Sequence, residues 1–372
     1  MSLNIQIEVD FIKKVVDMIH IYQQDHIDTS EKTKLDYKAC YNRLSNKRDS
    51  QNDDILALAA KTKSKNTWYK RRAAITHVCI DHLVHFKDQQ VSKLKELGNT
   101  SISNEERSVL QHAWVEQLST AKQYVKLLED MPTACPILKS EQKKRTSKRH
   151  HMKKLPSDWR QKILNEAIET WSLPIHVLAI TGCRPEELKK GIHLEVKNNQ
   201  LVCRIESSKV KDGKISVRKK IPSSDEVLKR TVNYHAGQKW REIYFDLGKY
   251  PMVDALAATI RTSASIEIKN ASSMTSTIRA IAKKLWPERK KSITAYCFRH
   301  ALGSDMKSSG MVLDDISIAL GHAVSATRSY YGQAKMSKGG HIPSLVIGSR
   351  QVKQSKKSPL PVRKSSPKTS AL

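Results

Sequence analysis

Three separated stretches in the C-terminal half of the chain concentrate arginine, histidine and tyrosine. They are residues 181–188, 294–300 and 320–331. Arginine carries a permanent, fork-shaped cation that suits phosphate oxygens, and a tyrosine hydroxyl can act as a nucleophile. Side chains of these types suit covalent chemistry on an anionic group, provided that the fold brings the three stretches together.

The first stretch places Arg184 at a junction between two predicted helices. One helix is expected to end at Thr181 and Gly182, and Pro185 favours the start of the next. Glu187 follows Arg184 by three residues, so its carboxylate can orient the guanidinium. Taken alone, an arginine paired with a glutamate at a helix start is more often structural than catalytic.

The second and third stretches also carry helix signals. Thr294 is expected to cap a helix that holds Tyr296 and Arg299 on one face, three residues apart. In the third stretch, one helix is predicted to stop at Gly321. A new helix over residues 326–331 is predicted to carry two adjacent tyrosines.

The elements around these stretches predict a mainly helical domain. Helices are expected at residues 159–169, 173–180, 253–260, 273–285, 294–308 and 313–320. Two β-branched runs, 201–206 and 215–221, are predicted to pair as a hairpin that turns at Asp212 and Gly213. This region should therefore combine helices with a small antiparallel sheet.

Residues 1–131 are predicted to be almost entirely helical. Five helices are expected. The first spans residues 6–23, the second begins after a cap at Thr29 or Ser30, and the third spans 54–61. The fourth begins after a cap at Asn66 or Thr67, and the fifth begins near residue 104. Such a bundle can bury a core by itself. The fourth helix carries the basic run Lys70, Arg71 and Arg72. A basic helix face is usually only solvated, but the charge of the whole chain favours contact with DNA.

A basic segment separates the two helical regions. Pro132 and Pro136 interrupt the helical pattern, and residues 143–154 contain seven lysines or arginines and no acid. We expect a linker that lies along a phosphate backbone; a flexible tether or a nuclear localisation signal are the alternatives. The residues expected to contact DNA here are Lys143, Lys144, Arg145, Lys148 and Arg149.

The predicted organisation is a helical domain over 1–137, a basic linker over 138–156, a second domain over 157–345 and a disordered Ser/Pro/Lys-rich tail over 346–372. Lys and Arg number 66 against 37 Asp and Glu, a net charge of +29 that favours a polyanionic partner. The six cysteines form no C-x-x-C pair, which argues against a disulfide scaffold or a zinc ribbon. We find no signal peptide, no apolar stretch of about 18–20 residues and no basic amphipathic helix with exposed aromatics. A cytoplasmic, nucleoid-associated protein without a membrane partner is expected.

Together, the motifs resemble those of the tyrosine recombinase (phage integrase) family. Residues 181–188 resemble its T-G-x-R-x-x-E-L box, Arg299 and His300 its R-H box, and residues 320–322 its L-G-H box. The order and spacing also agree, because Arg299, Gly310, His322 and Tyr331 follow at intervals of 11, 12 and 9 residues. The resemblance covers roughly residues 181–331. The N-terminal domain and linker are only compatible with the family's core-binding domain.

The resemblance implies a site without metal or cofactor. Its catalytic residues would be Arg184, Lys209, Tyr296, Arg299, His322 and Tyr331, with Glu187 and His300 in support. Lys209 would protonate the leaving oxygen, with Lys211 as the alternative, and Tyr331 would be the nucleophile, with Tyr330 as the alternative. Tyr296 stands where the family usually has histidine. A phenol can donate to a phosphate oxygen, but its reference pKa of about 10 prevents it from accepting a proton near neutral pH.

The implied function is site-specific recombination of double-stranded DNA through a 3′-phosphotyrosyl intermediate, integrating or excising a mobile element. The family's architecture implies a C-shaped clamp on DNA and a homotetramer on synapsed sites, with accessory DNA-bending or directionality factors. Residues 345–347 or the tail would reach a neighbouring protomer, and a prokaryotic or phage origin is expected. A telomere resolvase is the alternative within the enzyme class. A catalytically degenerate DNA-binding protein is the alternative outside it, and Tyr296 is the feature that favours it.

Overall fold

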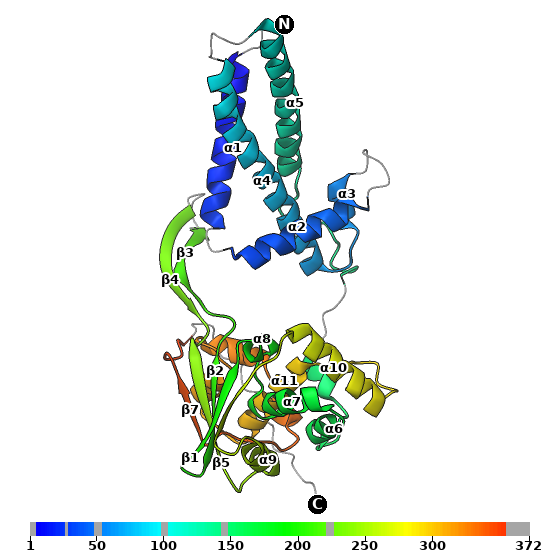
Figure 1. Ribbon diagram of the computed structural model, residues 1–372, viewed down its shortest axis with the longest axis vertical. Helices are drawn as coiled ribbons and strands as arrows, with labels where there is room; N and C mark the ends of the chain where they lie inside the picture. The colour runs from blue at the N-terminus through cyan, green and yellow to red at the C-terminus, as the bar shows by residue number, and fades with distance from the viewer. Residues whose placement is uncertain are drawn as a thin grey trace, which may run out of the picture. The chain divides into compact units, whose positions relative to one another are not determined.

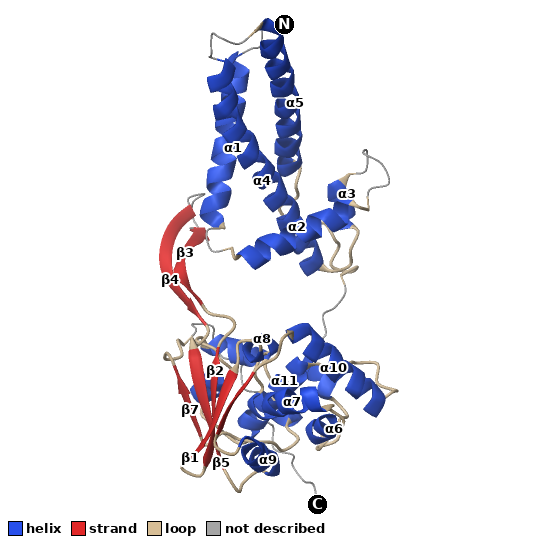
Figure 2. Cartoon of the chain, viewed as in Figure 1, coloured by secondary structure: helices blue, strands red, loops and turns tan. Residues whose placement is uncertain are grey.

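The computed structural model describes residues 5–26, 29–47, 54–97, 103–142, 148–220 and 227–354. It divides into two compact units, Met1–Arg145 and Thr146–Leu372 (Figure 1). The described chain is mainly helical with a small antiparallel sheet, as predicted (Figure 2). Within these ranges no helix has the length and apolarity needed to cross a membrane. The predicted DNA contacts Lys143, Lys144 and Arg145 lie outside the described residues.

Unit 1 consists of helices, as its periodicity predicts. They are α1 (Ile5–Asp25), α2 (Glu31–Ser45), α3 (Ile55–Ala60), α4 (Lys65–Leu97) and α5 (Asn104–Glu129). Ser30 caps α2 by accepting from the Thr33 N–H. The predicted cap of α4 is wrong by two or three residues. The helix begins at Lys65, and the Ser64 hydroxyl accepts the Thr67 N–H instead.

Two apolar clusters form the interior of unit 1, and α4 contributes to both. The first joins α1, α4 and α5, with Val15, Ile19, Leu83, Phe86, Leu118 and Val125 among its buried residues. The second joins α2, α3 and α4, with Leu44, Ile55, Ile75, Cys79 and Met131 buried. Burying these side chains holds short helices that would not be stable alone.

Unit 2 contains the helices that position the three motif stretches. They are α6 (Trp159–Asn165), α7 (Glu169–Thr181), α8 (Pro185–Leu188), α9 (Pro251–Ile260), α10 (Ala271–Leu285), α11 (Ala295–Ser308) and α12 (Leu313–Ala319), with 3₁₀ segments η1 (Lys148–Met152), η2 (Ser325–Tyr330) and η3 (Ala334–Met336). The helix predicted over residues 326–331 is present as the 3₁₀ segment η2, but it ends one residue early, at Tyr330. Tyr331 lies just after η2, because its backbone is bound to α11 rather than to a further helical turn.

A five-stranded antiparallel sheet has the order β6-β1-β2-β5-β7. Its strands are β1 (Ile192–Lys197), β2 (Gln200–Glu206), β5 (Trp240–Asp246), β6 (Ser263–Ile266) and β7 (Leu345–Gly348). Buried and half-buried positions alternate along β5, so one face of the sheet packs inward. The turn between β1 and β2 is Asn198 and Asn199, both with positive φ, which asparagine tolerates in a tight hairpin.

The predicted hairpin at Asp212 and Gly213 is wrong. Both residues lie inside β3 (Lys211–Lys220), which pairs with β4 (Val227–Ala236) as a separate two-stranded sheet. β2 instead pairs with β1 and β5. A turn signal at Asp212 and Gly213 cannot reveal this, because β2 already has a neighbour on each side: β1, across the tight turn before it, and β5, from farther along the chain.

Both boundaries predicted for the second domain need correction. His151, Met152 and Leu155, assigned to the linker, are buried in unit 2, and His151 Nδ1 lies 2.8 Å from the Ser292 carbonyl oxygen. At the other end, β7 pairs with β5 of the same chain, although residues 345–347 were expected to reach a neighbour. Lys353 then forms a parallel bridge with Val324, so packing continues beyond residue 345. The predicted tail beyond residue 354 lies outside the described residues.

Candidate active site

Residues from three separate segments form one buried cluster in unit 2. Arg184 is the last residue before α8, Arg299 and His300 belong to α11, and His322 follows the turn that ends α12. Their side chains are almost completely buried, and Arg299 has no exposed surface. Segments more than a hundred residues apart in sequence therefore meet. This juxtaposition is the one that the motif pattern requires.

Glu187 holds Arg184 in place. Its Oε1 accepts from Arg184 Nη1 at 2.5 Å, and its Oε2 accepts the Arg184 backbone N–H at 2.8 Å. Oε2 also accepts from Arg241 Nη2 at 2.8 Å. Burial alone would raise the pKa of Glu187, but the charges of Arg241 and Arg184 outweigh it and hold that pKa far below its ordinary value. Glu187 is therefore a buried anion between two cations, as predicted for a residue that orients Arg184.

Arg299 donates into the turns around it. Its Nη1 donates to the Gly182 carbonyl at 3.1 Å, and its Nη2 donates to the Leu320 carbonyl and lies 3.4 Å from His322 Nε2. Burial, followed by the charge of Arg184, lowers the pKa of Arg299 to about 9, so the side chain stays cationic at neutral pH. Burial, followed by the charges of Arg299 and Arg184, lowers the pKa of His322 to about 2. His322 is therefore neutral at physiological pH.

Two polar atoms of this cluster are orphaned. Arg299 Nε and His322 Nδ1 are buried and have no hydrogen-bond partner within the described residues. Buried polar groups in folded proteins are nearly always satisfied, and exceptions are often found at functional sites. An anionic group with several oxygens could accept from both atoms.

The ring of Tyr331 lies against this cluster. Its centroid is 4.8 Å from Arg299 Cζ and 5.1 Å from the ring centroids of both His300 and His322. Tyr330, by contrast, is 72% exposed. Of the two adjacent tyrosines, Tyr331 is therefore the one that the fold brings to the arginine and histidine side chains.

Tyr296 lies on the first turn of α11 and is half-buried. Burial, together with the neighbouring Tyr331, raises its pKa, although Arg184 and Arg299 act in the opposite direction. Its hydroxyl is therefore protonated at neutral pH and is a hydrogen-bond donor, as its residue type predicts.

Lys209 is not part of the buried cluster. It lies in the loop between β2 and β3, and its side chain is exposed. The backbone of this loop nevertheless lies close to the cluster. A Cβ on Gly237 would lie 2.1 Å from the Lys209 carbonyl oxygen. Gln238, which follows Gly237, donates its N–H to the carbonyl of Gly321, the residue before His322. The side chain of Lys211, the alternative, lies outside the described ones.

Two of the three predicted DNA contacts on α4, Lys70 and Arg71, have partners within unit 1. Lys70 forms an ion pair with Asp36 at 2.6 Å. Arg71 Nη1 donates to the carbonyls of Leu58, Ala59 and Lys61, at the C-terminal end of α3. Arg72 is half-buried, and the side chains of Lys148 and Arg149 are not among those described. Arg71 therefore has a structural role of its own.

Sequence reasoning missed Arg241. Its side chain has no exposed surface and bonds to Glu187, to the Ala319 carbonyl and to the Ser207 hydroxyl. The alternation of β5 offered a signal, because it puts Arg241 on the same face as Ile243 and Phe245. An arginine on the apolar face of a strand needs a buried partner.

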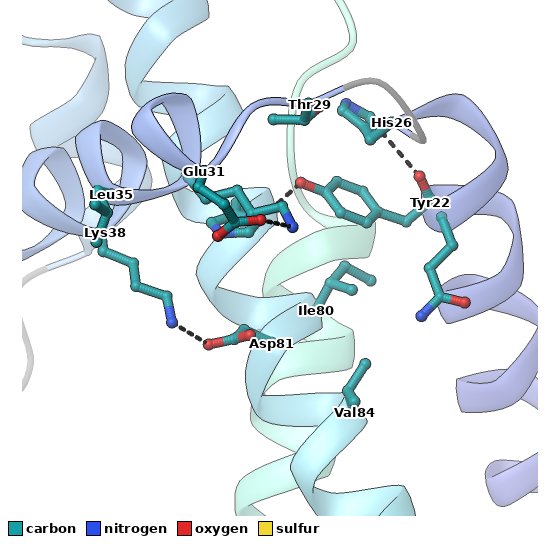
Figure 3. Close-up of a pocket in the computed structure, with 12 residues that line it drawn as sticks. Tyr22, His26, Thr29, Glu31, Leu35, Lys38, Ile80, Asp81 and Val84 are labelled. Carbon is teal, nitrogen blue, oxygen red and sulfur yellow. Dashed lines mark hydrogen bonds and ion pairs between the residues drawn. The ribbon is translucent and has the colours of Figure 1, made fainter.

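A separate pocket of about 520 Å³ lies in unit 1 between α1, α2 and α4 (Figure 3). Its charges pair with one another: Lys38 bonds Asp81 at 2.8 Å, and Lys34 bonds Glu31 at 2.6 Å. Burial raises the pKa of Tyr22, which lines the pocket, to about 12. None of the motif residues lies here. In the described ranges, no group of three or more His, Cys, Asp or Glu residues is placed to hold a metal ion.

Among solved structures, the chain is similar to a crystal structure of XerA recombinase. The similarity covers 80% of this chain and 93% of that chain, with 16% sequence identity and a TM-score of 0.30. No protein-family model and no curated protein matches the chain.

Proposed function

We propose that this chain is a site-specific tyrosine recombinase that cleaves and rejoins DNA, with Tyr331 as its nucleophile. The observation that carries the proposal is the position of the Tyr331 ring, against Arg299 and beside two histidines. The motif spacing and the net charge of +29 support the same assignment.

In the proposed reaction, the Tyr331 hydroxyl oxygen attacks a DNA phosphorus atom and its proton passes to solvent. A tyrosine–phosphorus ester bond forms at the 3′ side while the bond from phosphorus to the 5′ oxygen breaks. That oxygen leaves as a hydroxyl after taking a proton from Lys209, or from Lys211. Attack by a 5′ hydroxyl on the ester reverses these steps. The ester conserves the bond energy, so rejoining needs no ATP.

Arg184 and Arg299 would stabilise the charge that gathers on the non-bridging phosphate oxygens in the transition state. Both stay protonated, and the fold already holds them, so little reorganisation is needed as the charge develops. The low pKa of His322 keeps its ring neutral and makes it a poor proton carrier. His322 would therefore donate a hydrogen bond to the phosphate without transferring a proton. Tyr296 would likewise act as a donor.

The proposed partner is duplex DNA at the ends of a mobile element, with integration or excision as the outcome. A tetramer on two synapsed sites would exchange the strands, aided by accessory DNA-bending or directionality factors. Lys70 and Arg72 would contribute contacts to the phosphate backbone, together with the basic residues of the predicted linker, Lys143, Lys144, Arg145, Lys148 and Arg149.

The test uses duplexes from the ends of the DNA element that carries this gene, each nicked near the scissile phosphate so that cleavage is trapped. They are incubated without metal with the wild-type protein, with Tyr331→Phe and with Tyr330→Phe. We expect a protein–DNA adduct on denaturing gels for the wild type and Tyr330→Phe but not for Tyr331→Phe. Tight binding without any adduct would favour the degenerate DNA-binding protein, and hairpin products from intact duplexes would favour a telomere resolvase.

A further inference from the structure

Arg241 is a fully buried charged side chain beside the site, and the proposed chemistry does not use it. It lies on β5 with no exposed surface. A buried guanidinium must find acceptors for its N–H groups, since leaving a charge unpaired costs several kcal/mol. Its three acceptors come from three different segments: the Ala319 carbonyl at 2.8 Å, the Ser207 hydroxyl at 3.3 Å and Glu187 Oε2 at 2.8 Å.

Each of these segments leads directly to a residue of the proposed site. Glu187 binds Arg184 through its other carboxylate oxygen. Ala319 immediately precedes Leu320, whose carbonyl accepts from Arg299, and His322 follows two residues later. Ser207 directly follows β2 and lies two residues before Lys209.

Arg241 also packs against the turn that carries His322. A Cβ on Gly321 would lie 2.9 Å from Arg241 Nη1, so the turn approaches the guanidinium closely. Gly321 has a φ of +64°, a conformation that glycine adopts without strain. The arginine thus contacts the backbone of the turn as well as the carboxylate.

From these contacts we infer that Arg241 is a positioning residue for the proposed strand cleavage. It donates to Glu187 Oε2, so that the carboxylate holds the Arg184 guanidinium through Oε1 alone. The remaining N–H groups of the Arg184 guanidinium are then left for the phosphate. At the same time it fixes the turn that bears His322. The inference rests on the proposed function and adds to it a residue that touches neither the DNA nor Tyr331.

The test compares Arg241→Lys with Arg160→Lys. Arg160 is an equally suitable buried arginine, since it pairs with buried Asp305 at 2.8 Å but has no part in the site. Lysine keeps the positive charge at both positions but lacks the planar guanidinium group, whose N–H groups bind several acceptors at once. Single-turnover cleavage of the nicked duplex is measured with a normal scissile phosphate and with a methylphosphonate, in which a methyl group replaces one charged oxygen.

We expect Arg241→Lys to slow cleavage of the phosphate roughly 10- to 100-fold, below the loss for a direct oxyanion donor, while Arg160→Lys stays within about threefold of wild type. On the methylphosphonate, which has less charge for the arginines to neutralise, the Arg241→Lys defect should shrink to about threefold. A general loss of packing would slow both substrates equally, because it does not depend on the charge of the phosphate.

Several results would overturn the inference. They are an Arg241→Lys rate equal to wild type, an equal defect on both substrates, or an equal defect in Arg160→Lys at matched melting temperature. If Arg241→Lys does not fold, the double variant Arg241→Gln with Glu187→Gln removes both buried charges, and the same substrate comparison is made with it. If the wild type does not cleave the methylphosphonate, the rates of Arg241→Lys and Arg160→Lys on the phosphate are compared, and the inference requires the larger defect in Arg241→Lys. A wild type that forms no adduct contradicts the proposed function instead.

Discussion

Gly332 lies so close to Ser304 that a Cβ on the glycine would be 2.4 Å from the Ser304 backbone nitrogen. The Gly332 N–H donates to His300 Nδ1 at 3.3 Å, and Lys307 Nζ donates to the Tyr331 carbonyl at 2.5 Å. The backbone on the C-terminal side of Tyr331 is therefore bound to α11. Since α11 also carries Arg299, the distance between the proposed nucleophile and this arginine is set by direct contacts.

Gly332→Ala should displace Tyr331 and slow adduct formation about 100-fold, the loss expected for a misplacement of about 1 Å. The matched control is Gly310→Ala, because Gly310 also has a positive φ but no atom lies within 4 Å of its Cβ position. Both variants carry similar backbone strain, and only Gly332→Ala adds the clash. Equal rates for the two variants in the nicked-duplex assay would count against the packing argument.

Arg184→Ala and Arg299→Ala should each slow single-turnover cleavage roughly 10²- to 10³-fold, as removal of an oxyanion donor does. DNA affinity should change far less, because many basic residues share the contacts to the backbone. Arg279→Ala, which removes an exposed arginine of α10, is the control for loss of charge alone. A defect that appears in affinity rather than in rate would mean that the two buried arginines do not stabilise the transition state.

Acid should destabilise unit 2 between about pH 6.5 and pH 3. Burial, followed by nearby positive charge, lowers the pKa of His322 to about 2 and that of His341 to about 3. The unfolded chain therefore binds protons in this range that the folded chain does not bind. As a result, the free energy of unfolding decreases as the pH is lowered. Each histidine contributes up to about 1.4 kcal/mol per pH unit.

Urea denaturation at pH 7 and pH 5.5 measures this effect. His341→Phe removes one of the two titrations, so its stability should depend less steeply on pH than that of the wild type. His193→Phe, a change at an exposed position of β1, is the matched control. Wild-type stability that is unchanged between the two pH values would contradict the burial of neutral histidines.

Lys70 and Arg71 are adjacent on α4 but should respond differently to substitution. Arg71→Ala leaves three carbonyl oxygens at the end of α3 without their donor and should cost unit 1 about 1–2 kcal/mol. Lys70→Ala breaks an exposed ion pair and should cost less than about 1 kcal/mol.

If Lys70 also contacts a phosphate, its removal should reduce the salt dependence of DNA binding by about one counterion. Thermal melts of each variant and DNA titrations at several salt concentrations separate the two roles. A Lys70→Ala variant with an unchanged salt slope would remove this residue from the DNA contacts.

Helix content and the approximate helix ends were predictable from the sequence because both depend on neighbouring residues. Ser30 and Thr294 mark helix starts through their own backbone preferences, and the apolar period marks each buried face. The pairing of Arg184 with Glu187 was also predictable, since three residues separate them. The order and spacing of the motif residues were likewise visible, and the fold brings Arg299, His322 and Tyr331 together.

Tertiary structure decided what depends on distant partners. Asp212 and Gly213 have the composition of a turn, but strand pairing places them inside β3. Tyr331 was expected on a helix, but bonds to α11 end the helical segment before it. Arg241 was overlooked because its role depends on acceptors from three other segments. Local sequence encodes backbone preference, whereas a buried charge is positioned by whichever distant groups satisfy it, and only the packed chain shows which groups those are.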